Sequence, residues 1–199
     1  MLCATDPLPL RPSRVLVAGT SGSGKTTLAT IIATALQLPR VEIDALFHGP
    51  GWTARPTFEA EVAELAAGPT WVTEWQYSPV RALLADRADL LVWLDLSRPV
   101  VMASVTRRTL HRRLRRVELW NGNREPGLGT IFTDPEHIIR WAWSSHHRSR
   151  ERMPEVERRR PDLPIVRLRS RREVRQWVAG PLRAVGRYRR NGGGVDAGT

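Results

Sequence analysis

The sequence has little cysteine, no long apolar run and no regular spacing of histidines, and each shortage excludes a class of protein. The one cysteine, Cys3, excludes an intramolecular disulfide and a cysteine-rich metal site. No apolar run approaches the ~20 residues of a membrane-spanning helix, and the first residues lack the basic and apolar regions of a signal peptide. The five histidines show no metal-ligand spacing, which argues against zinc. We therefore expect a cytoplasmic protein without a membrane span.

Lysine is as scarce as cysteine. Of the 31 lysine and arginine residues, Lys25 is the one lysine, although codon bias alone could produce an excess of arginine. A lysine supplies a compact, mobile point charge, which a planar guanidinium does not replace. The net charge of +11 favours anionic partners, whether nucleotides, nucleic acid or acidic membrane surfaces, and does not choose among them.

The length of 199 residues, with 41% hydrophobic and 26% charged residues, predicts one soluble globular domain. Residues 1–12 contain three prolines and little periodicity, and we expect a flexible leader there. Residues 13–186 are expected to form the domain. The glycine-rich residues 187–199 are expected to be a disordered tail.

Short apolar runs alternate with longer helix-compatible ones, which is typical of an α/β protein with a parallel sheet and right-handed crossovers. The sequence predicts five strands, at residues 14–18, 40–44, 71–75, 90–95 and 164–168. It predicts helices at residues 27–36, 56–67, 78–86, 99–119, 135–152 and 170–185, the last capped by Ser170. Glycine and proline interrupt residues 119–134, which predicts a loop or lid.

The strongest motif is Gly19-Thr20-Ser21-Gly22-Ser23-Gly24-Lys25-Thr26, which fits the phosphate-binding pattern G-x-x-x-x-G-K-[ST] at every defined position. It lies between a predicted strand and a predicted helix that begins at Thr27. Glycines let backbone N–H groups approach an anion, and the helix adds its own free N–H groups. Lys25 can then reach the β- and γ-phosphates of ATP, and the Thr26 hydroxyl can bind Mg²⁺. A Gly/Ser turn that merely precedes a helix would explain less of this context.

Three acidic residues accompany the loop at one edge of the predicted sheet. Asp44, Glu74 and Asp95 each fall at the carboxyl end of a predicted strand, as the loop does. Parallel sheets bind their ligands at this edge. We therefore expect the functional site there.

Two further stretches narrow the comparison with known families. Residues 44–52 read DALFHGPGW and residues 120–125 read WNGNRE. Together with the loop they resemble the adenylate-kinase-like proteins often labelled DNA topology modulation proteins, over about residues 14–178. The resemblance implies a P-loop kinase fold, with a five-stranded parallel sheet flanked by helices and a short arginine-rich lid at about residues 119–134. It also implies transfer of a phosphoryl group from ATP to a small acceptor, with Mg²⁺ as the metal.

The chain departs from that family after the third predicted strand. Relatives usually have Asp-Gly-Asn-Tyr there, and this sequence has Glu74-Trp75-Gln76-Tyr77. Glutamate keeps the carboxylate but moves it by one methylene, and tryptophan fills space where backbone could approach a ligand. The departure therefore bears on the acceptor pocket more than on ATP binding.

The resemblance assigns roles to the acidic residues. Asp44 is the candidate general base or partner of the acceptor hydroxyl, and the alternative is a helix-capping or turn residue. Glu74 is a candidate for holding Mg²⁺ through water or for orienting the acceptor, and the alternative is a surface residue at a strand end. Asp95 matches the pattern of a Walker-B aspartate, although that strand end is often structural in such kinases.

Arginines are the expected clamp on the transferring phosphoryl group, because guanidinium donors are planar and permanently charged. The candidates are Arg108, Arg112, Arg113, Arg116 and Arg124. On a helix, Arg112 shares a face with Arg108 and with Arg116, each four residues away, and Arg124 lies in the expected lid. For any single helix arginine, a solvated basic face is the alternative. We expect nucleotide contacts from Arg108 and from Gly19 to Thr27.

Aromatic residues and two late arginines give weaker signals. Trp52 and Trp75 flank the expected acceptor site, where each either packs or stacks on a base. Arg171 or Arg172, after the last predicted strand, could cover an adenine ring.

Two classes of function fit the sequence. The first is an ATP- and Mg²⁺-dependent phosphotransferase acting on a small acceptor, which could be a nucleotide. The second is an ATPase or regulator associated with nucleic acid, favoured by the basic run at residues 107–116 but lacking any familiar nucleic-acid-binding motif. A kinase of a nucleic-acid 5′-hydroxyl would reconcile the two. The sequence is compatible with a monomer or a homodimer.

Overall fold

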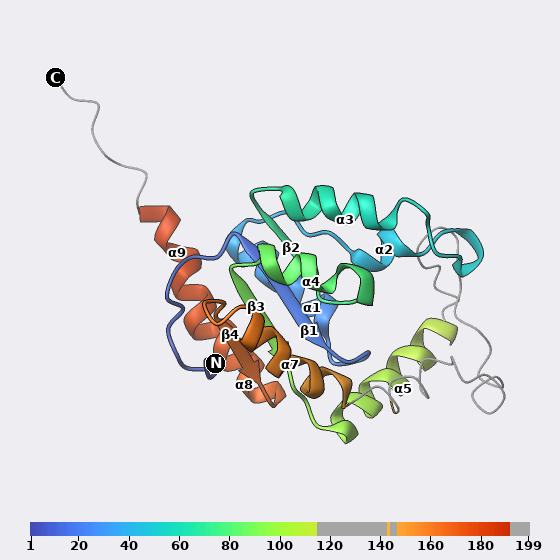
Figure 1. The fold of residues 1–199 in the computed structure, drawn as a ribbon. Coiled ribbons are helices and arrows are strands. Elements are labelled where there is room, and N and C mark those ends of the chain that lie inside the picture. The colour runs from blue at the N-terminus through green and yellow to red at the C-terminus, as the bar shows by residue number, and fades with distance from the viewer. Residues whose placement is uncertain (115–142, 144–146, 192–199) are drawn as a thin grey trace.

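The computed structural model describes residues 1–114, 143 and 147–191. In this part of the chain, a four-stranded parallel sheet forms the centre of the molecule (Figure 1). The strand order is β2-β1-β3-β4, with β2 spanning Trp71–Glu74, β1 Arg14–Gly19, β3 Leu90–Leu94 and β4 Ile165–Leu168. The sheet confirms the expected α/β class, with four strands where five were expected.

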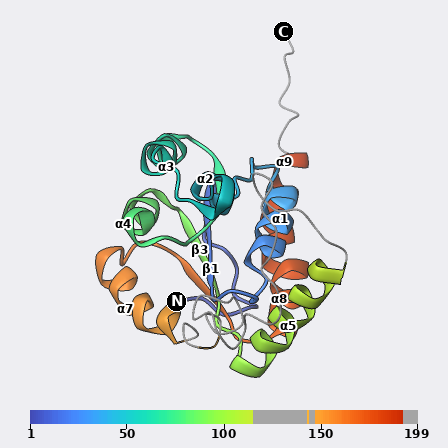
Figure 2. The same ribbon diagram turned by 90° about the vertical axis from the view of Figure 1, so that its right-hand side faces the viewer.

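Helices cover both faces of this sheet (Figure 2). One layer contains α1 (Lys25–Leu36), α5 (Arg98–Leu114), α8 (Arg171–Trp177), a π-helical turn (Val178–Leu182) and α9 (Arg183–Asn191). The other contains α2 (Ile43–Phe47), α3 (Phe58–Ala67), α4 (Ser78–Arg87) and α7 (Arg148–Arg159), with a short 3₁₀ turn at Pro50–Trp52. The sheet is thus the middle of three layers, as in other doubly covered parallel sheets.

The alternation of side chains along the strands explains the two layers, because successive residues of a strand point to opposite faces. In β1, Val15 and Val17 belong to the core that packs against α1, α5 and α8. Leu16 and Ala18 belong to the core that packs against α3, α4 and α7. All four are buried, so the continuous apolar run predicted from the sequence is a strand covered on both sides.

The strand predicted at residues 40–44 is wrong. Arg40 forms one isolated bridge with Val72, and the neighbouring backbone bond from Val41 N to Val72 O measures 3.0 Å. The chain then turns into α2 at Ile43, whose side chain is fully buried beneath that helix. Of the two apolar residues that suggested a strand, Val41 makes this one backbone bond and Ile43 begins the short helix.

The flexible leader expected at residues 1–12 differs from the structure, where these residues pack along the edge of the sheet. Leu2 forms a parallel bridge with Val166 of β4, and Arg167 N donates a hydrogen bond of 2.9 Å to Leu2 O. Ala4 and Leu8 lie in the core beneath. Apolar side chains within this proline-rich stretch are buried, although the stretch lacks the periodicity from which burial could have been predicted.

The ends of the other predicted elements differ in length. The last helical run continues to Asn191, so the domain boundary expected at residue 186 is too early, and residues 192–199 lie outside the described residues. Helix α7 continues to Arg159 where residue 152 was the expected end. The expected lid at residues 119–134 also lies outside the described residues. The remaining strands and helices that were predicted before residue 98 agree within two residues, apart from residues 40–44.

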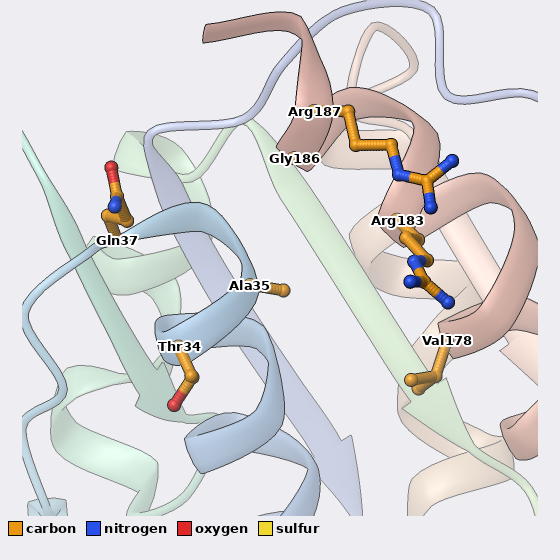
Figure 3. Close-up of a pocket in the computed structure, with 7 residues that line it drawn as sticks. All are labelled: Thr34, Ala35, Gln37, Val178, Arg183, Gly186 and Arg187. Carbon is orange, nitrogen blue, oxygen red and sulfur yellow. The ribbon is translucent and has the colours of Figure 1, made fainter. Parts of the chain in front are cut away.

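The C-terminal end of α1 packs against α9 beside a cavity of about 640 Å³ (Figure 3). Gly186 permits this packing, because a Cβ there would lie 2.7 Å from the carbonyl oxygen of Ala35. Arg183 and Arg187 line the cavity near the last turn of α1. The cation that opposes the partial negative charge at this end of α1 is Arg11, whose Nη2 donates a hydrogen bond to Leu36 O.

Candidate active site

The motif Gly19–Thr26 forms a loop between β1 and α1, as predicted. Gly22 has φ +79° and lies against α5, where an added Cβ would approach Val105 Cγ2 to 2.1 Å. Gly24 has φ +100° and is the N-cap of α1. A residue with a side chain would be strained at either place, because positive φ is costly outside glycine. The glycines of the motif therefore serve both the turn and the packing of the loop on α5.

The first turn of α1 is open for an anion. Gly24 provides no side-chain cap, and the helical bonding begins with Leu28 N donating to Gly24 O at 2.9 Å. The N–H groups of Lys25, Thr26 and Thr27 consequently have no partner within the helix. Free N–H groups and the positive end of the helix dipole together form a site for phosphate. The side chains of Thr26 and Thr27 are exposed beside it.

Lys25 lies inside the loop with 8% of its surface exposed. Its Nζ donates a hydrogen bond of 3.2 Å to the carbonyl oxygen of Thr20. Burial lowers the pKa of Lys25, while the nearby carboxylates of Asp44 and Glu74 oppose that shift. The lysine and the two predicted acidic residues therefore share one electrostatic site.

Glu74 ends β2, where it is in register with Val17 of β1. Its side chain is 3% exposed. Burial raises the pKa of Glu74, the charge of Asp44 raises it further, and Lys25 lowers it. The alternative of a surface strand-end residue is wrong, because this carboxyl group is enclosed at the sheet edge that carries the loop.

Asp44 reaches the same site from a different element than expected. It lies in the first turn of α2 and not at the end of a strand. Its Oδ1 accepts hydrogen bonds from Gln76 Nε2 at 2.9 Å and from Tyr77 Oη at 2.6 Å. Among the described residues, no hydrogen bond to Oδ2 is present. One carboxylate oxygen is thus held and the other remains available.

Asp95 differs from the Walker-B residue that its pattern suggested. It is 6% exposed, and its two oxygens accept hydrogen bonds from Arg150 Nε at 2.6 Å and from Arg167 Nε at 2.9 Å. The guanidinium group of Arg167 also lies 4.6 Å from the ring centre of Trp93. Two arginines therefore occupy this carboxylate, which indicates a structural role in joining α7 and β4 to the end of β3.

The arginine predictions are tested only in part. Arg108 of α5 lies beside the loop, where its Nη2 donates to Ser21 Oγ at 3.3 Å. The side chain of Arg112 lies outside what the structure describes, and the same is true of Arg113, Arg116 and Arg124. Their contact with phosphate stays a prediction.

Arg171 lies closer to the loop than the sequence indicated. Its Nη2 donates to Ser104 Oγ of α5 at 2.9 Å, and its Nη1 lies 3.1 Å from where a Cβ on Gly24 would be. Ser170 caps α8 as predicted, since its hydroxyl accepts from Glu173 N at 3.1 Å. This cap places Arg171 in the first turn of α8, beside the start of α1.

The two tryptophans near the site have different surroundings. Trp75 packs on the core of the α3–α4 layer, and its indole N–H donates to Arg81 O of α4 at 3.0 Å. Trp52 is 37% exposed, and its ring meets that of His48 edge to face at 5.1 Å. The large residue that replaces the glycine of the family pattern is thus anchored on α4, while Trp52 stays accessible.

Gln76 and Tyr77 are further candidate site residues, which the sequence analysis did not single out. Both follow β2 and contact Asp44. Tyr77 matches the tyrosine of the Asp-Gly-Asn-Tyr pattern quoted above, and this match was the one sequence signal that could have pointed to it. A contact between residues 33 positions apart is not visible in local sequence.

The donors at this edge suit a metal ion that is bound mainly by phosphate. No group of three His, Cys, Asp or Glu side chains suited to a metal ion occurs in the part of the chain that the structure describes. Mg²⁺ commonly uses one or two protein oxygens together with water and substrate phosphates. The exposed Thr26 hydroxyl and the carboxylate of Glu74 fit that pattern. Across the described ranges, no helix combines the length and apolar character needed to span a bilayer.

Comparisons with known proteins return structures only. No protein-family model matches the chain, and no curated protein matches it either. A gluconokinase from Sinorhizobium meliloti 1021 is 20% identical, with a TM-score of 0.45, over 92% of this chain and 99% of that one. A shikimate kinase from Acinetobacter baumannii is 17% identical, with a TM-score of 0.49, over 90% of each chain. A sugar kinase from a Janibacter species is 24% identical, with a TM-score of 0.36, over 73% of this chain and 98% of that one.

All of these TM-scores lie below 0.5. The fold class therefore rests on the sheet order and the loop described above. The resemblance to the DNA topology modulation proteins stays a prediction.

Proposed function

We propose that this protein transfers the γ-phosphoryl group of ATP, in the presence of Mg²⁺, to a hydroxyl group of a small acceptor. The observation that supports this most is the combination at one sheet edge of an open helix N-terminus, Lys25 and two carboxyl groups. Gly24 leaves the first turn of α1 without a side-chain cap. Asp44 and Glu74 both act electrostatically on Lys25. Such an arrangement suits phosphoryl transfer, in which positioning and charge stabilisation are most of the chemistry.

Each residue has a defined part in the proposed reaction. The N–H groups of the loop and of the first turn of α1 bind the phosphates, and Lys25 stabilises the charge that develops on them. The acceptor oxygen forms a bond to the γ-phosphorus while the bond from that phosphorus to the β–γ bridging oxygen breaks, so ADP leaves. Asp44 takes the proton of the acceptor hydroxyl.

Thr26 and Glu74 are the residues that would hold Mg²⁺, Thr26 directly and Glu74 through water. The ion would neutralise phosphate charge. Thr26 fits because its hydroxyl is exposed at the mouth of the loop. Glu74 fits because its buried carboxyl group shares the electrostatic site of Lys25.

An acceptor screen tests the proposal. The protein is incubated with γ-labelled ATP and Mg²⁺, with nucleoside monophosphates, nucleosides, sugars and 5′-hydroxyl oligonucleotides offered separately. Lys25→Ala removes the positive charge that the lysine brings to the phosphates. Arg175→Ala, on an exposed part of α8, is the matched control that removes a cation elsewhere. We expect label on one class of acceptor, retained in the control and lost in Lys25→Ala.

Two results would contradict the proposal. Bound ATP without label on any acceptor or on released phosphate would indicate a nucleotide-binding protein without transfer. Label on oligonucleotides that falls steeply with salt would instead favour the nucleic-acid alternative, since phosphate contacts to nucleic acid are salt-dependent.

A further inference from the structure

The turn after β2 places two side chains on Asp44. Gln76 N donates to Glu74 O at 3.1 Å, which folds the chain back directly after the strand. Gln76 and Tyr77 then reach α2 from this turn and donate to the same oxygen of Asp44, at 2.9 and 2.6 Å. Both donors are uncharged, so neither of these bonds places a cation on Asp44.

Tyr77 has an unusual backbone conformation for its residue type. Its φ is +57°, and it is the N-cap of α4. Bulky residues rarely adopt positive φ, so this conformation is strained. The strain is retained where the surrounding contacts fix it, and it often occurs at functional sites.

Aromatic packing fixes the ring of Tyr77. Phe47 of α2 stacks on it with ring centres 4.0 Å apart, and Phe58 of α3 meets it edge to face at 5.2 Å. Tyr77 Oη also lies 3.2 Å from His48 Nε2. The hydroxyl is therefore held from several sides, with Asp44 Oδ1 as its closest polar neighbour.

We propose that Tyr77 is the positioning residue of this site, whose hydroxyl, together with the Gln76 amide, holds Oδ1 of Asp44 so that Oδ2 receives the proton of the acceptor hydroxyl. This role rests on the proposed function, because it assigns a task to Asp44 in phosphoryl transfer. Tyr77 acts through Asp44 and takes no part in bond making. Its hydroxyl remains a donor throughout, since burial raises the pKa of Tyr77 and the charge of Asp44 raises it further.

A double-mutant cycle tests the role. Transfer from Mg·ATP, to water and to the acceptors of the panel above, is measured for Tyr77→Phe, Asp44→Asn and the double variant. Because misplacement of a reacting group by about 1 Å can cost ~10²-fold, we expect Tyr77→Phe to lower kcat by about 10- to 100-fold with an unchanged KM for ATP. The double variant should be no slower than Asp44→Asn alone. Tyr188→Phe, at the other tyrosine of the chain, is the matched control.

The contact itself is measured without catalysis. In a Tyr188→Phe background, 3-fluorotyrosine labels Tyr77 alone, and its phenol is titrated by fluorine NMR. We expect the phenol to titrate at lower pH after Asp44→Asn, because the neighbouring negative charge is gone. A merely structural tyrosine would show losses that add to those of Asp44→Asn and that accompany a lower melting temperature.

The outcomes separate the two proposals. If Asp44→Asn leaves the fluorinated phenol unchanged, the contact is absent in solution and the positioning role is wrong. If Asp44→Asn abolishes transfer and Tyr77→Phe does not reduce it, the role is also wrong while the proposed function stands. If the unmodified protein transfers no label to water or to any acceptor, the proposed function fails, and the positioning role fails with it.

Discussion

Asp44 and Asp95 lie at the same edge of one sheet, and their surroundings are opposite. Asp95 is bound through both oxygens by Arg150 and Arg167. Asp44 is bound through one oxygen by the neutral donors Gln76 and Tyr77. Arginines give strong, charge-assisted bonds, and neutral donors give weaker ones. The first carboxylate is paired with two cations and fixed through both oxygens, and the second is oriented through one oxygen by neutral donors.

This difference distinguishes a structural aspartate from the proposed general base, which the sequence alone could not do. A general base needs an oxygen that is free to take a proton. Asp44 has such an oxygen and no arginine bound to it, with Lys25 acting on it only through space, whereas both oxygens of Asp95 are bound by arginines. The exposed fraction of a carboxyl group does not distinguish a structural role from a role in the site. Glu74 is even more buried than Asp95, at 3% against 6%, yet it lies beside Lys25.

The largest expected effect is on catalysis at Asp44. Asp44→Asn should lower kcat for transfer by about 10²–10⁴-fold, which is the usual contribution of a general base, and should leave ATP binding unchanged. Single-turnover assays and a nucleotide-binding titration measure the two quantities. Asp95→Asn is the matched control at the same edge, and equal loss of transfer in both variants would remove the distinction between the two carboxylates.

Lys25 should be the next most sensitive residue, even when it is replaced by another cation, arginine. Lys25→Arg should lower transfer by about 10²–10³-fold, because the buried loop holds a compact ammonium and the planar fork of arginine cannot take its place. The reverse exchange Arg175→Lys, on an exposed part of α8, should leave activity unchanged. Activity close to wild type in Lys25→Arg would show that any cation suffices at this point.

Substitution of Asp95 should instead have its main effect on the free energy of unfolding. Asp95→Asn removes the charge that Arg150 and Arg167 share, and we expect a loss of about 2–3 kcal/mol of unfolding free energy. Arg150 is 52% exposed, which keeps the loss below that of a fully buried pair. For a chain of this size the melting temperature should fall by about 5–10 °C, as calorimetry can measure. An unchanged melting temperature would mean that the ion pairs contribute nothing.

The smallest effect is expected at Glu74 and depends on pH. The pKa of Glu74 is raised above its ordinary value of 4.5, so the folded chain holds this proton longer than the unfolded chain as pH rises. Stability is therefore lost between the ordinary and the raised value. Glu74→Gln should raise the melting temperature by a few degrees at pH 8 and leave it unchanged at pH 4.

Glu64→Gln, on an exposed part of α3, is the control for this measurement. A gain in melting temperature that is equal at both pH values would contradict the pKa assignment. In Glu74→Gln, a higher Mg²⁺ requirement for transfer would support the metal role of Glu74.

Features encoded in adjacent residues were predictable from the sequence. The loop needs glycine at fixed spacing between a strand and a helix, and all of this lies within residues 14–36. The cap at Ser170 is equally local. The burial of β3 followed from its unbroken apolar run. In each case the physical cause and the residues that carry it are neighbours in the chain.

Features that depend on distant residues were not predictable. Asp95 is bound by arginines 55 and 72 positions away, and a strand-end aspartate looks the same with or without them. The strand expected at residues 40–44 failed because Ile43 is buried as the first residue of α2 and not as part of a strand. The packed leader was missed because Leu2 finds its partner, Val166, at the far end of the chain.

The solitary lysine also makes the protein unusually simple to label. Reagents that acylate amines find two groups in the whole sequence, the N-terminal amine and the side chain of Lys25. Burial lowers the pKa of Lys25, which favours the nucleophilic amine, and leaves 8% of the residue exposed, so the rate of acylation also depends on access to the loop. A nucleotide in the loop would shield that amine. One acylation event, read by mass spectrometry, would therefore report whether the site is occupied, without any engineered tag.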